Sequence, residues 1–564
     1  MAQDAFTLRY LAEELDEEFR GGKVNRITEP TTEEVVFTIY NGKGTQKLYI
    51  SVNPSCPRIG MVAEEQPSPL TAPNFCMLLR KHLLSASVDK IALVGFDRII
   101  RIDFTAEKEF SDGDKKTLFV ELMGRYSNII LVEDGKVLGG NRGVNFFDNG
   151  VRPLIVGKNY VFPPTGDKKE PKDETLIEYF EKFNCSDKKT ISDYITFGVQ
   201  GIAQDTAKEI VRAYYAENTE FTAKNFYDFL VDFIYNTPKN PCVIIEGGKL
   251  KDVCSIDYKE KSGDRKYFNK LYLAEDFYFT NKNIEKQFLE KTERAKSIVN
   301  SALKKAKKRL AVINARIADA KESESDKIKG DLILSNIYKI KQGDEKCKLY
   351  NYYEDTEIEI TLDRELSPSK NAEKFYKRYA KGKRTILAQT PQKELAESEI
   401  AYLTAVADEI SLAENIDDVK LILEELKESG YIAKENTRQK PQKQQKYRHY
   451  LVGGFNVFVG RNNIENDELT FSAHAKDIWL HAKDYHSSHV IVETQNKEIS
   501  KSVLLTASEI CAYYSKGREG GKVEIVYTQK KYVKKPPKSK LGFCTYSEFK
   551  SITVIPNAHS ELLK

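Results

Sequence analysis

The feature that most constrains the fold of this chain is a long run without glycine or proline, from Asn281 to Lys329. Small and apolar residues recur in it every three or four positions, as one face of a packed helix requires: Ala302, Ala306, Leu310, Ile313, Ile317 and Ala320. A second run repeats this spacing between residues 396 and 426. Two such arms within residues 281–433, separated by an insert around 345–370, predict an antiparallel coiled coil with the insert at its tip. The periodicity alone also allows a coiled coil that joins two copies of the chain.

Residues 1–175 alternate short apolar runs with turn residues, which is typical of a sheet. Five of these runs are expected to be strands: residues 35–40, 48–52, 99–104, 118–122 and 129–132. Two helices, around residues 6–20 and 74–85, are expected to pack on the sheet.

Residues 176–280 look mainly helical. Within them Gly198 to Ala203, followed by Thr206 to Val211, favours a helix-hairpin-helix, because glycines permit a tight turn and the backbone N–H groups at the next helix start can meet phosphates. An ordinary two-helix turn fits this stretch at least as well.

The charge of the chain is unevenly placed. Its net charge is only +4, yet the segment from Lys434 to the end holds 22 Lys and Arg against 13 Asp and Glu, a net charge of +9 that leaves −5 for the rest. Residues 434–446 are expected to form a flexible basic linker and residues 447–564 a compact final domain. A basic domain on a mildly acidic body indicates a polyanionic partner, and a merely solubilising surface would give the same count.

Several functional classes are disfavoured. Eight scattered cysteines without a C-x-x-C pair fit neither a zinc site nor a disulfide framework, so reduced thiols are expected. The chain has no apolar run of membrane-spanning length, and its first residues, Met1 to Phe6, do not resemble a signal peptide, so the expected location is the cytoplasm. No phosphate-binding glycine motif or nucleophile motif occurs, so neither hydrolysis nor a cofactor is expected.

Three strings in the first half carry specific information: residues 74–83 (NFCMLLRKHL), 96–98 (FDR) and 121–128 (ELMGRYSN). The first fits a helix with one buried face, from which Arg80 and Lys81 point away. Asp97 and Arg98 precede an alternating strand. They could close a local turn through a salt bridge, or offer an acceptor and a fork of donors to a nucleotide.

The final domain holds three further strings: residues 455–462 (FNVFVGRN), 479–484 (WLHAKD) and 488–492 (SHVIV). His481, His486 and His489 are not spaced as zinc ligands, so no metal site is expected, and neutral histidines that hydrogen-bond the backbone or a phosphate fit better. Residues 530–540 (KKYVKKPPKSK) predict a basic loop in which Tyr532 could stack on a base, with a plain solvated loop as the alternative.

Together these strings resemble the RqcH-type ribosome quality-control factors of the NFACT family, which are also known as FbpA-like fibronectin-binding proteins. The resemblance covers nearly the whole chain and implies a multidomain α+β protein. Its parts would be a glycosylase-like N-terminal α/β-sandwich domain, a helix-hairpin-helix domain, a long antiparallel coiled coil and a C-terminal α+β RNA-binding domain. The chain departs from the family in one loop, where His486-Ser487-Ser488-His489 replaces Pro-Gly-Ser-His.

The resemblance also implies roles for particular residues. A tRNA-binding site would comprise Asp97 and Arg98, supported by Arg80, Lys81 and Arg125, with Glu121 orienting its neighbours. The RNA-binding residues of the C-terminal domain would be Arg461, Trp479, His481, Lys483, His489, Lys530, Lys531, Lys534 and Lys535.

The resemblance implies that the chain would bind large ribosomal subunits obstructed by peptidyl-tRNA, recruit alanyl-tRNA and direct alanine tailing without an mRNA template, which would mark the nascent chain for degradation. Peptide-bond formation would stay with the ribosome, so the chain positions substrates and is not expected to be an enzyme. The coiled-coil arm would reach the stalk base of the subunit, and a small RNA-binding partner of the RqcP type is expected.

Two other functions stay open at this level. A fibronectin-binding surface adhesin would need export, for which no signal is seen. A repair enzyme akin to the bifunctional DNA glycosylases would need an N-terminal Pro followed by Glu, whereas this chain has Ala2-Gln3. The sequence does not specify the preferred tRNA, nor whether Asp97 and Arg98 touch tRNA directly.

Overall fold

The computed structural model describes residues 3–64, 67–69, 71–108, 111–142, 152, 154–182, 188–433, 447–537 and 539–564. The chain divides into two compact units, Met1–Asn283 and Ile284–Lys564. The linker expected at 434–446, and Lys538 of the expected basic loop, lie outside the described residues. Among the helices of the described part, none combines the length and the apolar character needed to cross a membrane.

The first unit is built on a nine-stranded antiparallel sheet in the order β4-β3-β2-β1-β5-β6-β7-β8-β9. Two meanders meet at its centre, where Lys23 of β1 pairs with Ser87 of β5. All five strands expected from the sequence occur. The strands are β1 (Lys23–Thr31), β2 (Glu34–Tyr40), β3 (Thr45–Ser51), β4 (Arg58–Met61), β5 (Ser87–Leu93), β6 (Ile99–Lys108), β7 (Ser111–Glu121), β8 (Asn128–Glu133) and β9 (Lys136–Gly140).

Two helices cover this sheet, as expected. Helix α1 (Ala5–Phe19) begins at Asp4, whose carboxylate accepts the N–H of Thr7, and buries Phe6, Leu8, Leu11 and Leu15. Helix α2 (Asn74–Leu83) buries Phe75, Cys76, Leu79 and Leu83 against the same core. The N-terminal helix is thereby fixed to both meanders.

Helices α3 (Thr175–Glu181), α4 (Lys188–Gly198), α5 (Gln204–Glu217) and α6 (Ala223–Asn236) follow. They share one hydrophobic core with the large sheet, since Leu176, Phe180 and Ile210 belong to the same cluster as Phe37 of β2 and Phe104 of β6. A three-stranded sheet completes the unit, which the expectation of a mainly helical segment missed: β10 (Cys242–Glu246), β11 (Lys249–Cys254) and β12 (Asp264–Tyr267).

A buried carboxylate ties the start of helix α7 (Leu271–Glu322) to the N-terminus. Gln3 Nε2 donates to both oxygens of Glu275, at 2.7 and 2.8 Å, and to the Ile59 carbonyl. Burial raises the pKa of Glu275 to about 7, although the hydrogen bonds from Gln3 and the charge of Arg58 oppose the shift.

This shift predicts a pH dependence of stability. The pKa of Glu275 is higher in the folded chain than the ordinary 4.5 of the unfolded chain. The folded state therefore binds more protons between these values, and stability falls as pH rises from about 4.5 through 7. We expect Glu275→Gln to remove this fall, which amounts to at most about 3 kcal/mol. Urea unfolding at pH 5 and pH 8 measures it, with the exposed Glu290→Gln of the same helix as the control. An equal pH response in wild type and Glu275→Gln would contradict the assignment.

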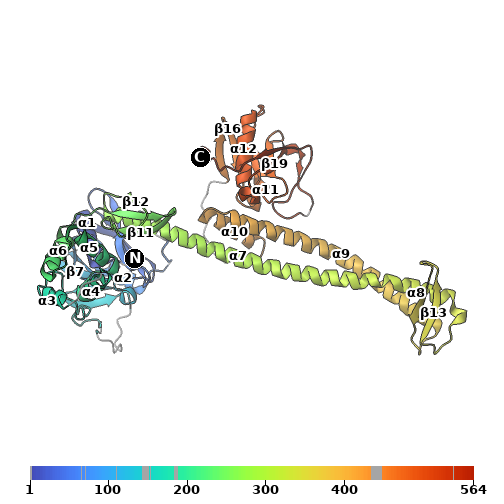
Figure 1. Ribbon diagram of the computed structural model, residues 1–564, viewed down its shortest axis with the longest axis horizontal. Helices are drawn as coiled ribbons and strands as arrows, with labels where there is room; N and C mark the ends of the chain where they lie inside the picture. The colour runs from blue at the N-terminus through green and yellow to red at the C-terminus, as the bar shows by residue number, and fades with distance from the viewer. Residues whose placement is uncertain are drawn as a thin grey trace. The chain divides into compact units, whose positions relative to one another are not determined.

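In the second unit, α7 and α9 (Pro368–Leu412) run antiparallel and side by side (Figure 1). Ala295, Val299 and Ala306 of α7 cluster with Leu403 and Val406 of α9. Nearer the insert, a Cβ on Gly382 of α9 would lie 1.8 Å from Ser323 Oγ, so the two backbones approach closely there. Helix α10 (Ile416–Glu428) adds Val419, Ile422 and Leu426 to the same cluster.

The insert expected around 345–370 forms a small folded module. It comprises helix α8 (Glu324–Ser335) and the hairpin of β13 (Lys346–Asn351) and β14 (Thr356–Thr361). Leu332, Ile333, Leu349, Ile360 and Phe375 form its core. The hairpin thus folds onto the end of the helical pair and packs against the start of α9.

The C-terminal domain is a six-stranded antiparallel sheet in the order β15-β16-β18-β17-β19-β22. Helix α12 (Lys501–Tyr513) packs on one of its faces. The remaining elements are β15 (Arg448–Val452), β16 (Phe455–Val459), α11 (Asn463–Ser472), β17 (Ile478–Ala482), β18 (Val490–Val492), β19 (Val523–Gln529), β22 (Lys550–Val554) and the short ribbon of β20 (Val533–Lys534) and β21 (Thr545–Tyr546).

Candidate nucleic-acid interface

The Asp97–Arg98 pair lies at a polar pocket of about 270 Å³, which we call the Asp97 pocket. Five segments that are far apart in the sequence close it. They are the N-terminus with Gln3 and Asp4, the β5–β6 loop with Asp97 and Arg98, Met123 after β7, residues 164–168, and the α4–α5 turn at 200–203. The pocket therefore joins the large sheet to the helical part of the same unit.

Asp97 is held from two sides. Its Oδ1 accepts the N–H of Arg98 at 2.7 Å, and its Oδ2 accepts from Gln200 Nε2 at 3.2 Å. Gln200 is fixed in turn by a backbone hydrogen bond to Lys169. The sequence left open whether Asp97 closes a turn or serves a ligand, and the geometry shows that one oxygen does close the local turn.

Gly201 brings the α4–α5 turn against the Asp97 loop. It has a φ of +74°, and a Cβ there would lie 2.2 Å from the Phe96 carbonyl oxygen. Asp4 adds a second link, because its Oδ2 accepts from Ala203 N at 3.2 Å and from Thr206 Oγ1 at 2.6 Å. The glycine expected in a phosphate-binding turn therefore serves here to let two loops touch.

The cationic side of the pocket is less constrained. Arg98 is half-buried, and within the described ranges its guanidinium forms no hydrogen bond or ion pair. Lys168 is exposed and donates to the Thr196 carbonyl at 2.8 Å. Partial burial and the nearby Arg98 charge lower the pKa of Lys168, while Asp97 opposes them. An uncommitted guanidinium beside a carboxylate can hydrogen-bond the edge of a base or the phosphate of a nucleotide.

Sequence reasoning missed several residues of this pocket. Asp4, Lys168 and Gln200 were not candidates, because no local pattern shows which distant loop will meet Asp97. Conversely Arg80, Lys81 and Arg125 do not line the pocket: Arg80 Nε donates to the Ile27 carbonyl at 2.8 Å, and Lys81 and Arg125 are exposed.

Glu121 is buried in an ion pair. Arg152 donates to both of its oxygens, at 2.6 and 2.9 Å, and Tyr160 Oη donates to Oε1 at 2.7 Å. The carboxylate therefore faces its own domain and orients Arg152 and Tyr160. A direct contact with tRNA would require this cluster to open.

Of the aromatic residues expected to bind RNA, Trp479 and His489 are buried inside the C-terminal domain, whereas His481 and Tyr532 are partly exposed. Trp479 has no exposed surface and packs between Leu469, Ile491 and Val526. The ring of Trp479 therefore offers no face to a base in this conformation. Its ring is parallel to that of His481 at 5.5 Å between centroids.

Burial lowers the pKa of three histidines in this region, His481, His486 and His489. Burial, and then the neighbouring His486, lower the pKa of His481 to about 4. Burial also lowers the pKa of His489, whose Nδ1 is 2.7 Å from Thr470 Oγ1. Trp479, His481 and His489 line one pocket of about 580 Å³. Within the described part of the chain, no group of His, Cys, Asp or Glu is arranged to hold a metal ion.

The basic residues of the C-terminal domain that are candidates for RNA binding differ in their ion pairing and in their exposure to solvent. Arg461 forms a two-pronged ion pair with Glu465, and Lys483 pairs with Glu524 at 3.0 Å. Lys535 pairs with Asp467. The most accessible are Lys531 and Lys534, which are exposed, whereas Lys530 is half-buried. The structure thus gathers Lys530, Lys531 and Lys534 around the start of the β20–β21 ribbon, where a phosphate backbone can reach them.

Two family models match the chain. A family model described as the NFACT N-terminal and middle domains matches residues 4–445, and one described as the NFACT protein RNA binding domain matches residues 446–542. The chain is 31% identical to the Rqc2 homolog RqcH of Streptococcus suis, over 99% of this chain and 98% of that protein. It is 29% identical to the Rqc2 homolog RqcH of Bacillus subtilis, with the same coverage.

Among solved structures, the N-terminal part of the fibronectin/fibrinogen-binding protein from Streptococcus suis is matched at 25% identity. That match covers 49% of this chain and 99% of the other, with a TM-score of 0.42. The C-terminal part of the same protein is matched at 29% identity, over 50% of this chain and 100% of the other, with a TM-score of 0.40.

Proposed function

This chain belongs to the NFACT family, and on that premise we propose that it is a ribosome quality-control factor that holds tRNA on obstructed large ribosomal subunits. It recruits alanyl-tRNA and directs C-terminal alanine tailing of the stalled chain. Full-length similarity to proteins named Rqc2 homolog RqcH supports this proposal.

The observation that carries the tRNA role is the guanidinium of Arg98. It is half-buried at a polar pocket, beside the carboxylate of Asp97, and has no partner in the described part of the chain. A half-buried donor fork without an internal acceptor is stabilised by an external one, such as a phosphate or the edge of a base. The α4–α5 turn at 200–203 and Lys168 complete the surface that tRNA would contact.

The remaining parts have supporting roles in this proposal. The α7–α9 pair with its insert extends to the stalk base of the subunit. The C-terminal domain grips RNA through Lys530, Lys531 and Lys534, and a small RqcP-type protein assists. The protein acts in the cytoplasm and is not an enzyme, because the ribosome forms the peptide bond and this chain orders the reacting partners.

The test is co-sedimentation of the tagged full-length chain from lysate, with sequencing of the bound RNA. We expect large subunits and a narrow set of tRNAs with the wild type. In Asp97→Ala/Arg98→Ala we expect tRNA binding to be about tenfold to a hundredfold weaker, since charge-assisted hydrogen bonds worth about 1.5–3 kcal/mol are removed.

Arg101→Ala/Asp103→Ala is the matched control. This pair forms an exposed ion pair at 2.9 Å on the neighbouring strand β6, so the same two charge types are removed outside the pocket. Equal tRNA loss in both double variants would contradict the assigned site. Absence of subunits and tRNA from the wild-type fraction would overturn the function, and binding to immobilised fibronectin would then favour an adhesin.

A further inference from the structure

Helix α7 carries an excess of positive charge that neither the Asp97 pocket nor the C-terminal domain explains. Between Glu293 and Asp319 the sequence holds eight Lys and Arg and no Asp or Glu. Five of these basic residues lie in one short stretch: Lys304, Lys305, Lys307, Lys308 and Arg309. On a helix, like charges three or four residues apart destabilise one another.

Of these five residues, Arg309 pairs with Glu399 of α9, whereas the four lysines have no such partner in the described part of the chain. The four lysines are exposed, and across the described residues none of them forms an ion pair or a hydrogen bond. Elsewhere on the same helix such pairs do form, between Lys286 and Glu290 and between Lys296 and Glu293. The stretch therefore keeps its cations available to solvent.

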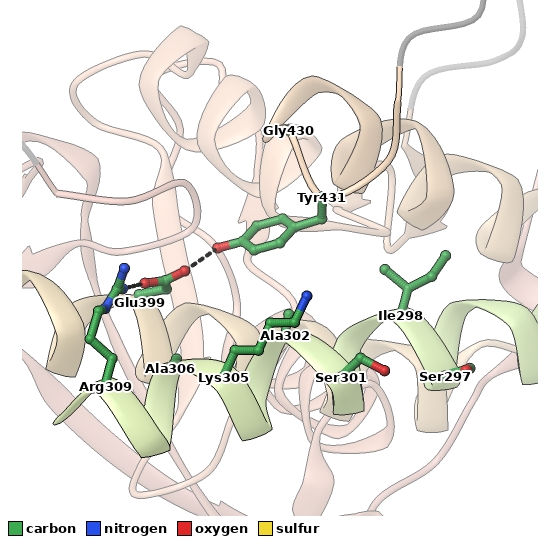
Figure 2. Close-up of a pocket in the computed structure, with 10 residues that line it drawn as sticks. All are labelled: Ser297, Ile298, Ser301, Ala302, Lys305, Ala306, Arg309, Glu399, Gly430 and Tyr431. Atoms are coloured by element: carbon green, nitrogen blue, oxygen red, sulfur yellow. Dashed lines mark hydrogen bonds and ion pairs between the residues drawn. The ribbon is translucent and has the colours of Figure 1, made fainter. Parts of the chain in front are cut away.

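Beside these lysines lies a pocket of about 590 Å³ between α7, α9 and the residues after α10. Ser297, Ser301 and Lys305 follow one another at one-turn spacing on α7, and Figure 2 shows Lys305 extending into the space below Tyr431. Glu399 pairs with Arg309 and accepts from Tyr431 Oη at 3.3 Å, which fixes the far wall. From Ser297 to Arg309 the lined face is about 18 Å long.

We propose that this lysine face, defined as Lys304, Lys305, Lys307 and Lys308 with the adjoining pocket, is an RNA-contact surface that takes phosphodiester groups. Lysine ammonium groups interleaved with serine hydroxyls are the side chains that commonly meet nucleic-acid phosphates. This inference adds a further RNA contact to the proposed function. It rests on that function only for the identity of the RNA that the lysine face contacts in the cell.

A membrane surface fits this face poorly. A helix that lies on a membrane needs an apolar face beside its basic face. The apolar face of α7 packs against α9 instead, where Ala295, Val299 and Ala306 are buried. RNA fits better, because a phosphate backbone needs only cations and hydroxyls and because the same chain carries a matched RNA-binding domain.

The test is binding of the full-length chain to a short RNA duplex of arbitrary sequence, by fluorescence anisotropy at increasing salt. For Lys304→Ala/Lys305→Ala/Lys308→Ala, we expect affinity at low salt to fall at least about tenfold. The slope of log affinity against log salt should shrink by about two to three, near one for each phosphate that the variant no longer neutralises. The control, Lys224→Ala/Lys251→Ala/Lys286→Ala, removes three exposed lysines that already have carboxylate partners.

An unchanged slope, or an equal loss of affinity in the control, overturns the proposal. Equally tight binding of polyglutamate by the wild type also overturns it, because the face would then be a general anion surface suited to an acidic protein. A chain that binds the duplex through this face but co-sediments with neither subunits nor tRNA would instead refute the proposed function and leave this inference standing.

Discussion

An alanine at position 201 is expected to force apart the α4–α5 turn and the Asp97 loop. Its Cβ would lie 2.2 Å from the Phe96 carbonyl oxygen and 2.5 Å from the Ala5 Cβ, and both belong to rigid, buried surroundings. The φ of +74° adds the cost of a left-handed backbone, about 1–2 kcal/mol. Overpacking adds about 1–3 kcal/mol. We therefore expect Gly201→Ala to lower the free energy of unfolding by about 2–5 kcal/mol, as measured by urea denaturation.

Gly21 provides a matched control. Its φ is +75°, and no atom lies within 4 Å of the position that a Cβ would take. Gly21→Ala should therefore cost only the backbone strain, about 1–2 kcal/mol. The difference between the two variants isolates the steric contact at Gly201. Similar destabilisation by both would contradict the close packing of the turn on the Asp97 loop.

The Gly201→Ala variant should also bind tRNA more weakly where it is still folded. Gln200 reaches Asp97 only because the turn lies close, and moving it outward would remove the 3.2 Å hydrogen bond and widen the pocket. Anisotropy titration with tRNA, at a temperature at which both glycine variants remain folded, measures this effect. Wild-type affinity in a destabilised Gly201→Ala would show that the turn is not part of the binding surface.

The sequence allowed the elements to be predicted more fully than the site. Strands and long helices follow from periodicity, which is a local property, so β2, β3, β6, β7, β8 and the runs that became α7 and α9 were within reach. The pocket around Asp97 was not, because Asp4, Lys168 and Gln200 come to line it only through the packing of segments far apart in the chain.

The environment of Trp479 could not be predicted from its own strand. The second face of the sheet is covered as well as the first, by α11 and the β20–β21 ribbon with Leu469, Val533 and Tyr546. The continuous apolar run Val490–Val492 in the neighbouring strand was the available signal, because strands buried on both faces lose their alternation.

Glu121→Ala is expected to lower the free energy of unfolding by about 3–5 kcal/mol, because it strands a buried positive charge. The Arg152 side chain is only 14% exposed and donates two hydrogen bonds to Glu121. Tyr160, stacked on Phe119 at 4.1 Å, would lose the acceptor of its hydroxyl. Arg152→Ala strands the opposite charge and should cost a similar amount. Urea denaturation of each single variant measures the loss of stability.

The double variant Glu121→Ala/Arg152→Ala separates a structural role for Glu121 from a tRNA contact. Removing both charges should cost clearly less than the sum of the two single effects, because no unpaired buried charge remains. A purely structural Glu121 then predicts that the folded double variant binds tRNA nearly as well as the wild type, since the carboxylate does not line the Asp97 pocket. If the double variant is stable and yet loses tRNA as severely as Asp97→Ala/Arg98→Ala, Glu121 or Arg152 must contact the RNA, and the buried cluster must open when it binds.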